Sequence, residues 1–367
     1  MKVKLEDVCE RGSSNLKQSD VIDKTGNYPI YGATGYIGNV DFYQQEKPYV
    51  AVVKDGSGIG KTTLHPAKSS VIGTMQYLLP KDNVLPEYLC YVVKYMHLEK
   101  YFTGATIPHI YFKDYKNEQF NLDELDRQKE IVEILGKLED VIATRNEELR
   151  KLDDLIKARF VEMFGNPVSN SYGLPEATLP ELGEFGRGVS KHRPRNDPKL
   201  LGGEYPLIQT GDVANAGLYI TSYNSTYSEL GLKQSKMWHK GTLCITIAAN
   251  IAKTAILEFD ACFPDSVVGF NANEKANNIF IHYWFSFFQA ILEAQAPESA
   301  QKNINLKRLS ELKVIVPEKE KQDEFVEFIK QVDKSKLIAL IIKVSILFIF
   351  FDFAIQMMIK IILEQRD

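Results

Sequence analysis

A heptad pattern of apolar residues dominates the middle of the chain. Between Asp123 and Phe164 one series of positions recurs every seven residues, and a second series lies four residues earlier in each heptad. The two series are Leu135, Ile142, Leu149, Ile156 and Met163, and Ile131, Leu138, Arg145, Leu152 and Arg159. Such a stripe needs a partner helix to cover it. The pattern predicts a helix of about 40 residues, roughly 60 Å long, which the Gly165-Asn166-Pro167 segment ends.

Short apolar runs separated by Gly, Asn and Pro precede this helix. Segments 49–53 and 71–79 have the pattern of buried strands. Pro86 is well placed to open a helix, which we expect to run to about Phe102. The second half of the chain shows the same order, with strands expected over 242–247 and 266–270 and a helix over 279–295. These patterns predict an α+β fold built from two similar mixed α/β domains.

The duplication is also visible residue by residue. The segment 127–134 reappears at 321–328, a displacement of 194 positions, and 110–113 reappears at 304–307 with the same displacement. Near the start of each half, Tyr28-Pro29-Ile30 matches Tyr205-Pro206-Leu207. This period is too long for a solenoid, whose repeats span about 20–50 residues. A duplicated domain presents two similar surfaces, which suits a polymer with two similar binding sites, and DNA is the obvious candidate.

The second copy of the helix departs from the first. It is expected to begin at Pro317, and its stripe continues through Phe325, Ile329 and Val332. Lysines then stand where the first copy has apolar residues: Lys336 replaces Ile142 and Lys343 replaces Leu149. We therefore expect a truncated helix over 317–336 and an atypical apolar tail over 337–367.

The few charges in the tail bear on whether it could span a membrane. From Leu337 to Leu363 the charged residues are Lys343, Asp352 and Lys360. A membrane span needs about 20 apolar residues, and three charges inside this segment argue against one. We hypothesise that a frameshift or recombination replaced the distal helix. Sequencing the downstream DNA tests this, because the idea fails if no other frame encodes a charged heptad continuation.

Charge and cysteine usage narrow the class of protein. The net charge is −4 and the pI is about 6.0, which argues against a protein that coats nucleic acid without specificity. The four cysteines are far apart and form no CxxC motif, so neither a zinc site nor a disulfide framework is indicated. The first residues contain no apolar signal region. We expect reduced cysteines and a cytoplasmic protein.

A glycine-rich segment, Asp55-Gly56-Ser57-Gly58-Ile59-Gly60-Lys61-Thr62-Thr63, resembles a phosphate-binding P-loop. The P-loop pattern requires glycine where Asp55 stands, and a carboxylate there repels phosphate. A P-loop also feeds a helix, whereas Pro66 follows closely. We therefore expect a turn between strands that carries Lys61 and Thr62 towards a DNA backbone.

Signals for catalysis are missing from the sequence. DNA methyl transfer needs a cofactor-binding glycine loop and an Asn/Asp-Pro-Pro-aromatic loop, and neither occurs. The histidines have no metal-ligand spacing, and the carboxylates lie mostly on the predicted helices rather than in a nuclease-like cluster. We expect no catalytic residue, no metal and no cofactor in this chain.

Two loops that follow the domain helices are candidate base readers. Segment 103–111 is polar, turn-rich and aromatic, and its counterpart is 297–305. Asn and Gln can bind adenine, and Lys can bind guanine, in the major groove. A third candidate is the basic segment 187–199, which could contact phosphates. The predicted DNA-binding residues are Lys61, Thr62, Thr106, His109, Tyr111, Lys113, Lys191, Arg193, Arg195, Gln301, Lys302, Asn303 and Lys307.

The order of these features resembles the specificity subunit of type I restriction–modification systems. The resemblance covers about residues 1–336 and rests on four motifs. They are Gly56-Ser57-Gly58-Ile59-Gly60-Lys61, Gly104-Ala105-Thr106-Ile107-Pro108-His109-Ile110, Ser299-Ala300-Gln301-Lys302-Asn303-Ile304, and Val316-Pro317 with Gln322. It implies target recognition domains at 1–122 and 167–316, joined by a central helix at 123–166 that packs antiparallel to the second helix as a coiled coil.

The resemblance also implies partners. Each domain would read one half of a split site on double-stranded DNA. Two methyltransferase subunits would dock on the helices, and restriction/translocase subunits would join them. S-adenosylmethionine, ATP and Mg would belong to those subunits. The expected partner-binding helix positions are Leu135, Leu138, Ile142, Leu149, Leu152, Ile156, Phe325, Ile329 and Val332.

Three other interpretations stay open at this point. The chain could be a coiled-coil adaptor whose duplicated domains bind something other than DNA, and it would then show no salt-dependent DNA affinity. It could be a nucleotide-dependent enzyme, which titration with ATP tests. It could be anchored to a membrane by its tail, which cell fractionation with and without the residues after Lys336 tests.

Overall fold

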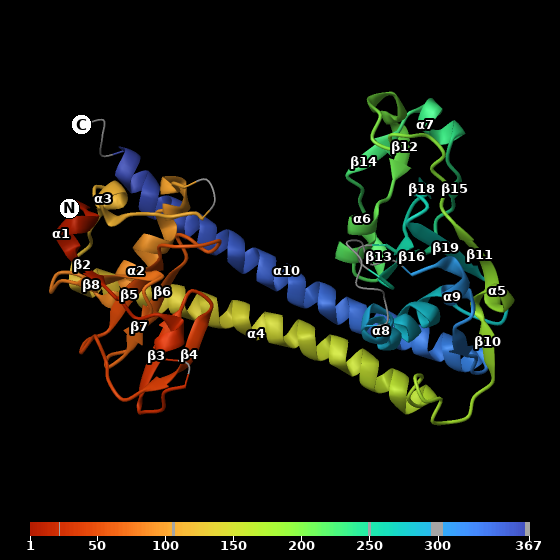
Figure 1. The fold of residues 1–367 in the computed structure, drawn as a ribbon, viewed down its shortest axis with the longest axis horizontal. Coiled ribbons are helices and arrows are strands. Elements are labelled where there is room, and N and C mark those ends of the chain that lie inside the picture. Colours follow the sequence, from red (N-terminus) through yellow and green to blue (C-terminus); the bar gives the residue numbers. More distant parts are fainter. Residues whose placement is uncertain (22, 105–106, 249–250, 295–303, 364–367) are drawn as a thin grey trace. The chain divides into compact units, whose positions relative to one another are not determined.

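The computed structural model describes residues 1–21, 23–104, 107–248, 251–294 and 304–363 (Figure 1). The chain divides into two units. The first comprises Met1–Asn146 together with the chain from Ile341 onward, and the second comprises Glu147–Leu340. Each unit contains one copy of the duplicated domain.

The first unit contains a four-stranded sheet of order β2-β8-β5-β6, a three-stranded sheet of order β4-β3-β7, and a separate β1-β9 pair. Its strands are β1 (Lys2–Lys4), β2 (Cys9–Ser13), β3 (Tyr28–Gly32), β4 (Gly35–Val40), β5 (Tyr49–Val53), β6 (Thr62–His65), β7 (Ser70–Val71), β8 (Met75–Pro80) and β9 (Gln119–Asn121). Its short helices are α1 (Leu5–Val8), η1 (Gln18–Asp20), α2 (Pro86–Tyr95), η2 (Leu98–Tyr101) and α3 (Phe112–Tyr115). Strand β5 is buried along its whole length.

The second unit repeats this plan with additions. Its sheets have the orders β11-β19-β16-β17-β13 and β14-β12-β18-β15, and β10 pairs with β20. The strands are β10 (Glu176–Thr178), β11 (Gly183–Arg187), β12 (Leu201–Leu207), β13 (Tyr219–Ile220), β14 (Ser225–Tyr227), β15 (Met237–Trp238), β16 (Leu243–Thr246), β17 (Thr254–Leu257), β18 (Ala261–Cys262), β19 (Val267–Ala272) and β20 (Lys313–Ile315). The helices are α5 (Leu179–Leu182), η3 (Pro198–Leu200), α6 (Thr210–Asn215), α7 (Glu229–Lys233), α8 (Asn278–Ala294) and α9 (Leu306–Ser310).

Strand register confirms the duplication predicted from the sequence. Strand β5 lies between β6 and β8, and its counterpart β16 lies between β17 and β19, in both cases antiparallel. The parallel pair β3-β7 recurs as β12-β18. The predicted helix over 279–295 is α8. The predicted α+β fold with two similar domains is therefore confirmed.

The helix expected to run from Pro86 to about Phe102 is shorter than predicted. Helix α2 ends at Tyr95, and the 3-10 turn η2 follows it. Between them the backbone of His97 has a φ of 50°. A non-glycine residue in this left-handed region cannot continue an α-helix. The sequence around His97 contains no Gly or Pro that would have predicted this break.

Helix α4 (Leu125–Phe164) contributes to the core of each unit. In the first unit Ile131 and Leu135 are buried against α2 and the sheet, and Leu138 packs beside them. In the second unit Ile156 is buried and Leu152 packs against the core. Leu135 and Ile156 are therefore covered within their own units and are not available to a separate subunit. Ile156 shares its cluster with Phe325, Ile329 and Val332 of the second long helix, as the expected pairing of the two helices requires. Ile142 and Leu149 are half-buried.

Helix α10 (Lys319–Leu363) contradicts the predicted truncation at Lys336. The composition changes there, but the segment contains no Gly or Pro, and Ile, Leu and Phe do not end a helix as those residues do. Its first turns lie in the second unit's core, where Phe325, Ile329 and Val332 are buried. These three positions, too, are not available to a separate subunit.

Within the second unit α10 runs antiparallel to α4, as expected. Arg159 of α4 pairs with Glu324 of α10 at 2.9 Å, and Asp153 pairs with Lys336 at 2.7 Å. Residue numbers thus fall along one helix as they rise along the other. Lys336, which interrupts the apolar seam, is held by this ion pair. In the part of the chain that the structure describes, no helix is long and apolar enough to cross a membrane.

Candidate nucleic-acid interface

The glycine-rich segment is the connection between β5 and β6. Its ends are joined by hydrogen bonds from Gly60 N to Val53 O and from Val53 N to Lys61 O, both 2.9 Å. Gly56 and Gly60 have φ values of 98° and 82°, which favour glycine. The segment leads into a strand and not into a helix. This arrangement confirms that it is a turn between strands and not a P-loop.

A second loop is fastened to this turn. Thr103 and His109 exchange backbone hydrogen bonds of 2.9 and 2.8 Å, which close the loop between them. Gly56 N donates to Pro108 O at 3.0 Å, and Ile110 N donates to Lys54 O at 3.0 Å. The two segments are separate candidates in the sequence, and the structure brings them together.

A side-chain pair completes this junction. The Nδ1 atom of His109 lies 2.6 Å from Oδ1 of Asp55. The imidazole of His109 stacks near the ring of Tyr111, with centroids 6.3 Å apart and an interplanar angle of 24°. Lys113 places its Nζ atom 5.5 Å from the centre of the Tyr111 ring. Cationic, aromatic and hydrogen-bonding groups therefore occupy one exposed edge of the first unit.

The third element of this edge could not be recognised from the sequence. The turn of the β3-β4 hairpin lies beside the glycine-rich turn, because Lys61 Nζ donates to Ala33 O at 3.5 Å. Tyr36, just after that turn, is 62% exposed. Exposed aromatic rings and cationic side chains are both used by surfaces that bind nucleic acid. The sequence marks this hairpin only through the repeat of Tyr28-Pro29-Ile30, and its position depends on contacts between distant segments.

Thr62 does not belong to this edge. Its side chain is buried, and its hydroxyl donates to Gly60 O at 3.0 Å. The hydroxyl therefore stabilises the turn and has no free surface for a ligand, so we correct this prediction. Lys61, Tyr111 and Lys113 are exposed, as a contact with DNA requires. Thr106 lies outside the described residues.

The described residues of the second unit repeat one joining bond of this arrangement. Ile304 N donates to Ile247 O at 2.9 Å, which matches the bond from Ile110 to Lys54 in the first unit. The turn between β16 and β17 is closed by Thr246 N donating to Lys253 O at 2.9 Å. The predicted contact residues Gln301, Lys302 and Asn303 lie outside the described residues. Lys307 is exposed and pairs with Glu311 at 3.8 Å.

The basic segment of the second unit is only partly available. Arg195 pairs with Asp265 at 2.6 Å, and Arg193 lies 3.7 Å from the same carboxylate. The side-chain oxygen of Gln234 accepts hydrogen bonds from the backbone nitrogens of Lys191 and His192, at 2.7 and 3.1 Å. The loop is thus held in place. Lys191 is exposed on it, whereas the two arginines are already paired with an acid.

Other candidate sites gain no support from the described residues. Within them no group of three or more His, Cys, Asp or Glu side chains is arranged to hold a metal ion. All four cysteines are buried free thiols. Burial raises the pKa of Cys9 to about 12 and that of Cys90 to about 11, so these thiols stay protonated at neutral pH.

The family is decided by a domain match. A model described as the type I restriction modification DNA specificity domain matches residues 1–153 and 176–344, which is most of the chain. The chain belongs to this family. The two matched segments correspond to the two copies of the duplicated domain, each with its helix, and so agree with the repeat in sequence and topology. The family resemblance stated from the motifs is therefore confirmed.

Relatives of this specificity-family chain carry matching names. The putative type I restriction enzyme MjaX specificity subunit of Methanocaldococcus jannaschii is 22% identical over 292 residues, which cover 75% of this chain and 68% of that protein. The type I restriction enzyme MjaVIII specificity subunit of the same organism is 27% identical over 138 residues, which cover 37% of this chain and 32% of that protein.

Solved structures show the same fold. The S subunit of a type I restriction–modification system from M. genitalium has a TM-score of 0.59 at 17% identity, covering 97% of this chain and 95% of that one. A chain from a study of complex assembly and conformational transition in the type I system has a TM-score of 0.57 at 14% identity, covering 97% of each. At these identities the likeness concerns the fold alone.

Proposed function

We propose that this specificity-family chain binds double-stranded DNA and reads a split sequence, one half with each unit. One observation carries the proposal. A backbone hydrogen bond that joins the strand hairpin to the residue two positions before a short helix occurs at the same place in both units, Ile110 to Lys54 and Ile304 to Ile247, and the sequences around it differ. Asp55 and His109 of the first unit correspond by position to Ala248 and Asn303 of the second. One backbone arrangement that carries two sets of side chains is suited to the recognition of two different base sequences.

The proposed contacts divide into two classes. Lys61 and Lys191 are exposed cations on loops, and Lys113 is exposed on the short helix α3. All three suit phosphate contacts, which position a protein without reading sequence. His109 and Tyr111, together with Gln301, Lys302 and Asn303, are the candidate base-reading residues. A net charge of −4 means that DNA affinity has to come from such local cationic surfaces and not from the whole chain.

We further propose that the chain performs no chemistry itself. Methyltransferase subunits, two of them, and restriction/translocase subunits would dock on it and would bind S-adenosylmethionine, ATP and Mg. The exposed parts of α4 and α10 are the surfaces we assign to this docking, since the stripe residues nearest each domain are already buried in its core.

Selection from a randomised DNA duplex library tests this function. The chain, alone and together with the methyltransferase subunits of its system, should enrich a bipartite sequence with a fixed spacing. Lys302→Ala or Gln301→Ala should relax one half-site and leave the other intact. Lys61→Ala should weaken all sequences uniformly and reduce the slope of log affinity against log salt by about 1.

A matched control, used with the chain alone because exposed parts of α4 are assigned to docking, is Lys137→Ala, since Lys137 is exposed and pairs with Glu133 at 2.6 Å. It should leave the selected sequence and the salt slope unchanged. If no bipartite sequence is enriched under either condition, the proposal fails and an adaptor that binds another partner becomes the better interpretation.

A further inference from the structure

A fully buried glutamine stands at the start of each long helix. Gln128 of α4 and Gln322 of α10 are both 0% exposed. Glutamine is mostly an exposed residue, and burying its amide costs free energy unless its polar atoms find partners. A leucine would fill the same space without that cost. The burial of these two amides is therefore explained by the groups to which they are hydrogen-bonded.

In the first unit the amide ties α4 to the segment that leads into α2. Gln128 Nε2 donates to Asn83 O at 3.0 Å and to Asp123 O at 2.8 Å. Its Oε1 accepts from Leu85 N at 2.8 Å. Leu85 immediately precedes α2. One side chain thus holds the first turn of the long helix to the start of the domain helix.

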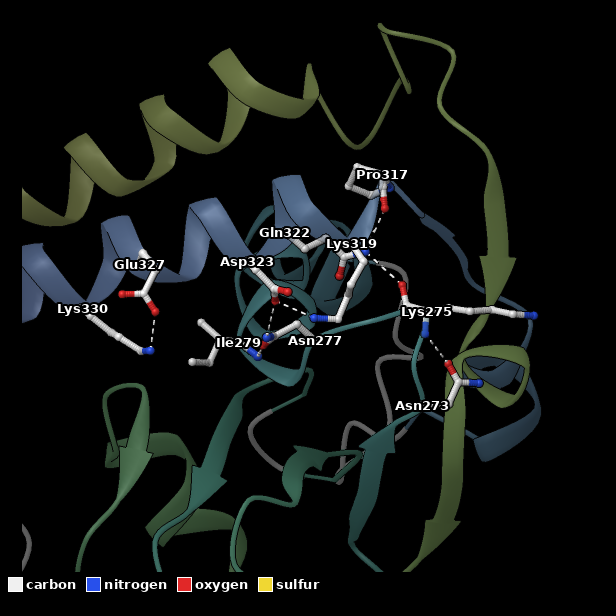
Figure 2. A network of polar contacts seen from close by, with 10 residues as sticks. All are labelled: Asn273, Lys275, Asn277, Ile279, Pro317, Lys319, Gln322, Asp323, Glu327 and Lys330. Atoms are coloured by element: carbon white, nitrogen blue, oxygen red, sulfur yellow. Dashed lines mark hydrogen bonds and ion pairs between the residues drawn. The ribbon is translucent and has the colours of Figure 1, made fainter.

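The second unit repeats this arrangement (Figure 2). Gln322 Nε2 donates to Lys275 O and to Pro317 O, each at 2.9 Å. Pro317 lies five residues before its glutamine, as Asp123 lies five residues before Gln128. Lys275 lies just before α8, as Asn83 lies just before α2. We call these two sets of contacts the first joint and the second joint.

The two joints differ on their acceptor side. In the second joint Asn277, at the position equivalent to Leu85, uses its Oδ1 to accept from Ile279 N at 2.9 Å. Its Nδ2 donates to Asp323 Oδ1 at 3.4 Å, and Asp323 also pairs with Lys319. Among the described groups, Oε1 of Gln322 has no hydrogen-bond partner. The first joint is thus the more completely bonded of the two.

Apolar contacts alone would not fix the direction of the domain on its helix. Ile131 and Leu135 bury area, and burial is not directional. Hydrogen bonds are directional, with distance and angle both constrained. Each glutamine lies on a long helix and binds backbone groups in the segments that lead into that helix and into the domain helix, so it constrains the angle between the two helices.

The two cores also differ in which described side chains of the long helices enter them. Among the described residues, the first unit's core around α2 includes side chains of α4 and none of α10. The core of the second unit includes Phe160 and Phe164 of α4 as well as Phe325 of α10. The second domain is therefore held by two helices. The amide of the first joint makes three hydrogen bonds and that of the second makes two, so loss of the first should have the larger effect.

We propose that Gln128 and Gln322 are positioning residues that set the direction of each recognition domain on its helix, and so restrict the spacing accepted between two DNA half-sites. The proposal rests on the proposed function for its DNA part. It requires neither glutamine to touch DNA. The base sequence that each unit recognises should depend on the loops. The spacing between the two half-sites should depend on the joints.

The first experiment measures the joints without DNA. Spin labels at Ser57→Cys and Lys137→Cys report the first joint, and labels at Lys191→Cys and Lys330→Cys report the second, since the four native cysteines are buried. Gln128→Leu should broaden the distance distribution of the first pair, and Gln322→Leu should broaden that of the second pair by less. Gln331→Leu, an exposed glutamine on α10, should broaden neither. Unchanged distributions would overturn the proposal.

The second experiment uses the DNA selection. Gln128→Leu should keep both half-site words and accept at least one additional spacing, and Gln322→Leu should do so more weakly. Unchanged spacing, or loss of one word in a folded protein, would overturn the role. If Gln128→Leu does not fold, Gln128→Met, which keeps the length of the side chain, takes its place. A wild-type chain that selects no bipartite site would refute the proposed function, while the labels would still decide the joints.

Discussion

The ring of Phe160 on α4 stands edge-on to the ring of Phe325 on α10, with centroids 5.4 Å apart and planes at 84°. Phe160 also stacks on Phe280 of α8, at 5.3 Å and 20°. Three helices therefore meet at one buried ring. The contact makes the end of α4 a part of the second domain's core and not only a connection between domains.

Replacing this ring should damage the second unit as a core substitution does. Phe160→Ala should lower the free energy of unfolding by about 3–5 kcal/mol, because a fully buried phenylalanine leaves a cavity. Urea denaturation followed by circular dichroism measures the effect. The neighbouring Val161→Ala is the control, since Val161 is 38% exposed and should cost less than about 1 kcal/mol. Equal effects at both positions would show that the ring is not part of the core.

The sequence predicted the repeat well because both the residue types and their spacing recur in the second half. Gln128 and Gln322 mark the equivalent helix starts, and the apolar runs mark β5, β8 and their counterparts. The convergence of the glycine-rich turn with the loop at His109 could not be predicted. Those segments lie about 50 residues apart, and the hydrogen bonds that join them are mainly from backbone atoms, which carry no sequence signal.

The error at Lys336 has a physical reason as well. A change from charged to apolar composition signals a change of environment, and we interpreted it as the end of a helix. Helix formation depends on the absence of Gly and Pro and on backbone hydrogen bonds, which Leu, Ile and Lys all permit. The heptad stripe was similarly ambiguous. It predicted burial correctly at Ile156 but could not say that the burial is against its own domain.

A buried histidine should make the first unit sensitive to acid. His65 is 5% exposed, and burial lowers its pKa to about 4. Its Nε2 atom lies 2.8 Å from Thr63 Oγ1. In the unfolded chain a histidine has a pKa of about 6.5. As the pH falls, the unfolded state therefore binds a proton before the folded state does. The contribution of His65 to the free energy of unfolding is fully present above pH 6.5 and is lost between pH 6.5 and 4.

The expected loss from His65 is about 3 kcal/mol over that pH range. Urea denaturation at pH 7.5, 6, 5 and 4 measures it. His65→Gln should remove this part of the pH dependence, although it also lowers stability at neutral pH. His282, whose pKa burial also lowers to about 4, should retain its own contribution in that variant. A pH profile identical to that of the wild type would contradict the assignment to His65.

The ion pair between Asp153 and Lys336 should contribute little to stability. The side chain of Asp153 is 64% exposed and that of Lys336 is 24% exposed, so water screens the pair. Exposed pairs typically contribute about 0–1 kcal/mol. Lys336→Met should therefore be neutral or slightly stabilising, because methionine restores the apolar seam. A double-mutant cycle with Asp153→Asn measures the coupling, and a coupling above about 2 kcal/mol would show that the pair is a main support of the two helices.

The outer face of α10 beyond Lys336 should make the isolated chain associate with itself. Leu337, Ile341, Val344 and Phe348 are between 41% and 73% exposed, and their spacing of four, three and four residues places them on one face. Contiguous exposed apolar surface of this kind marks an interaction site or an aggregation liability. The double variant Ile341→Glu/Phe348→Glu should reduce self-association, measured by light scattering after size-exclusion chromatography over a range of protein concentrations. Leu155→Glu on α4 tests whether charge alone is sufficient, since Leu155 is 48% exposed and lies outside this face. If that single change were as effective as the double variant, added charge and not this face would govern association.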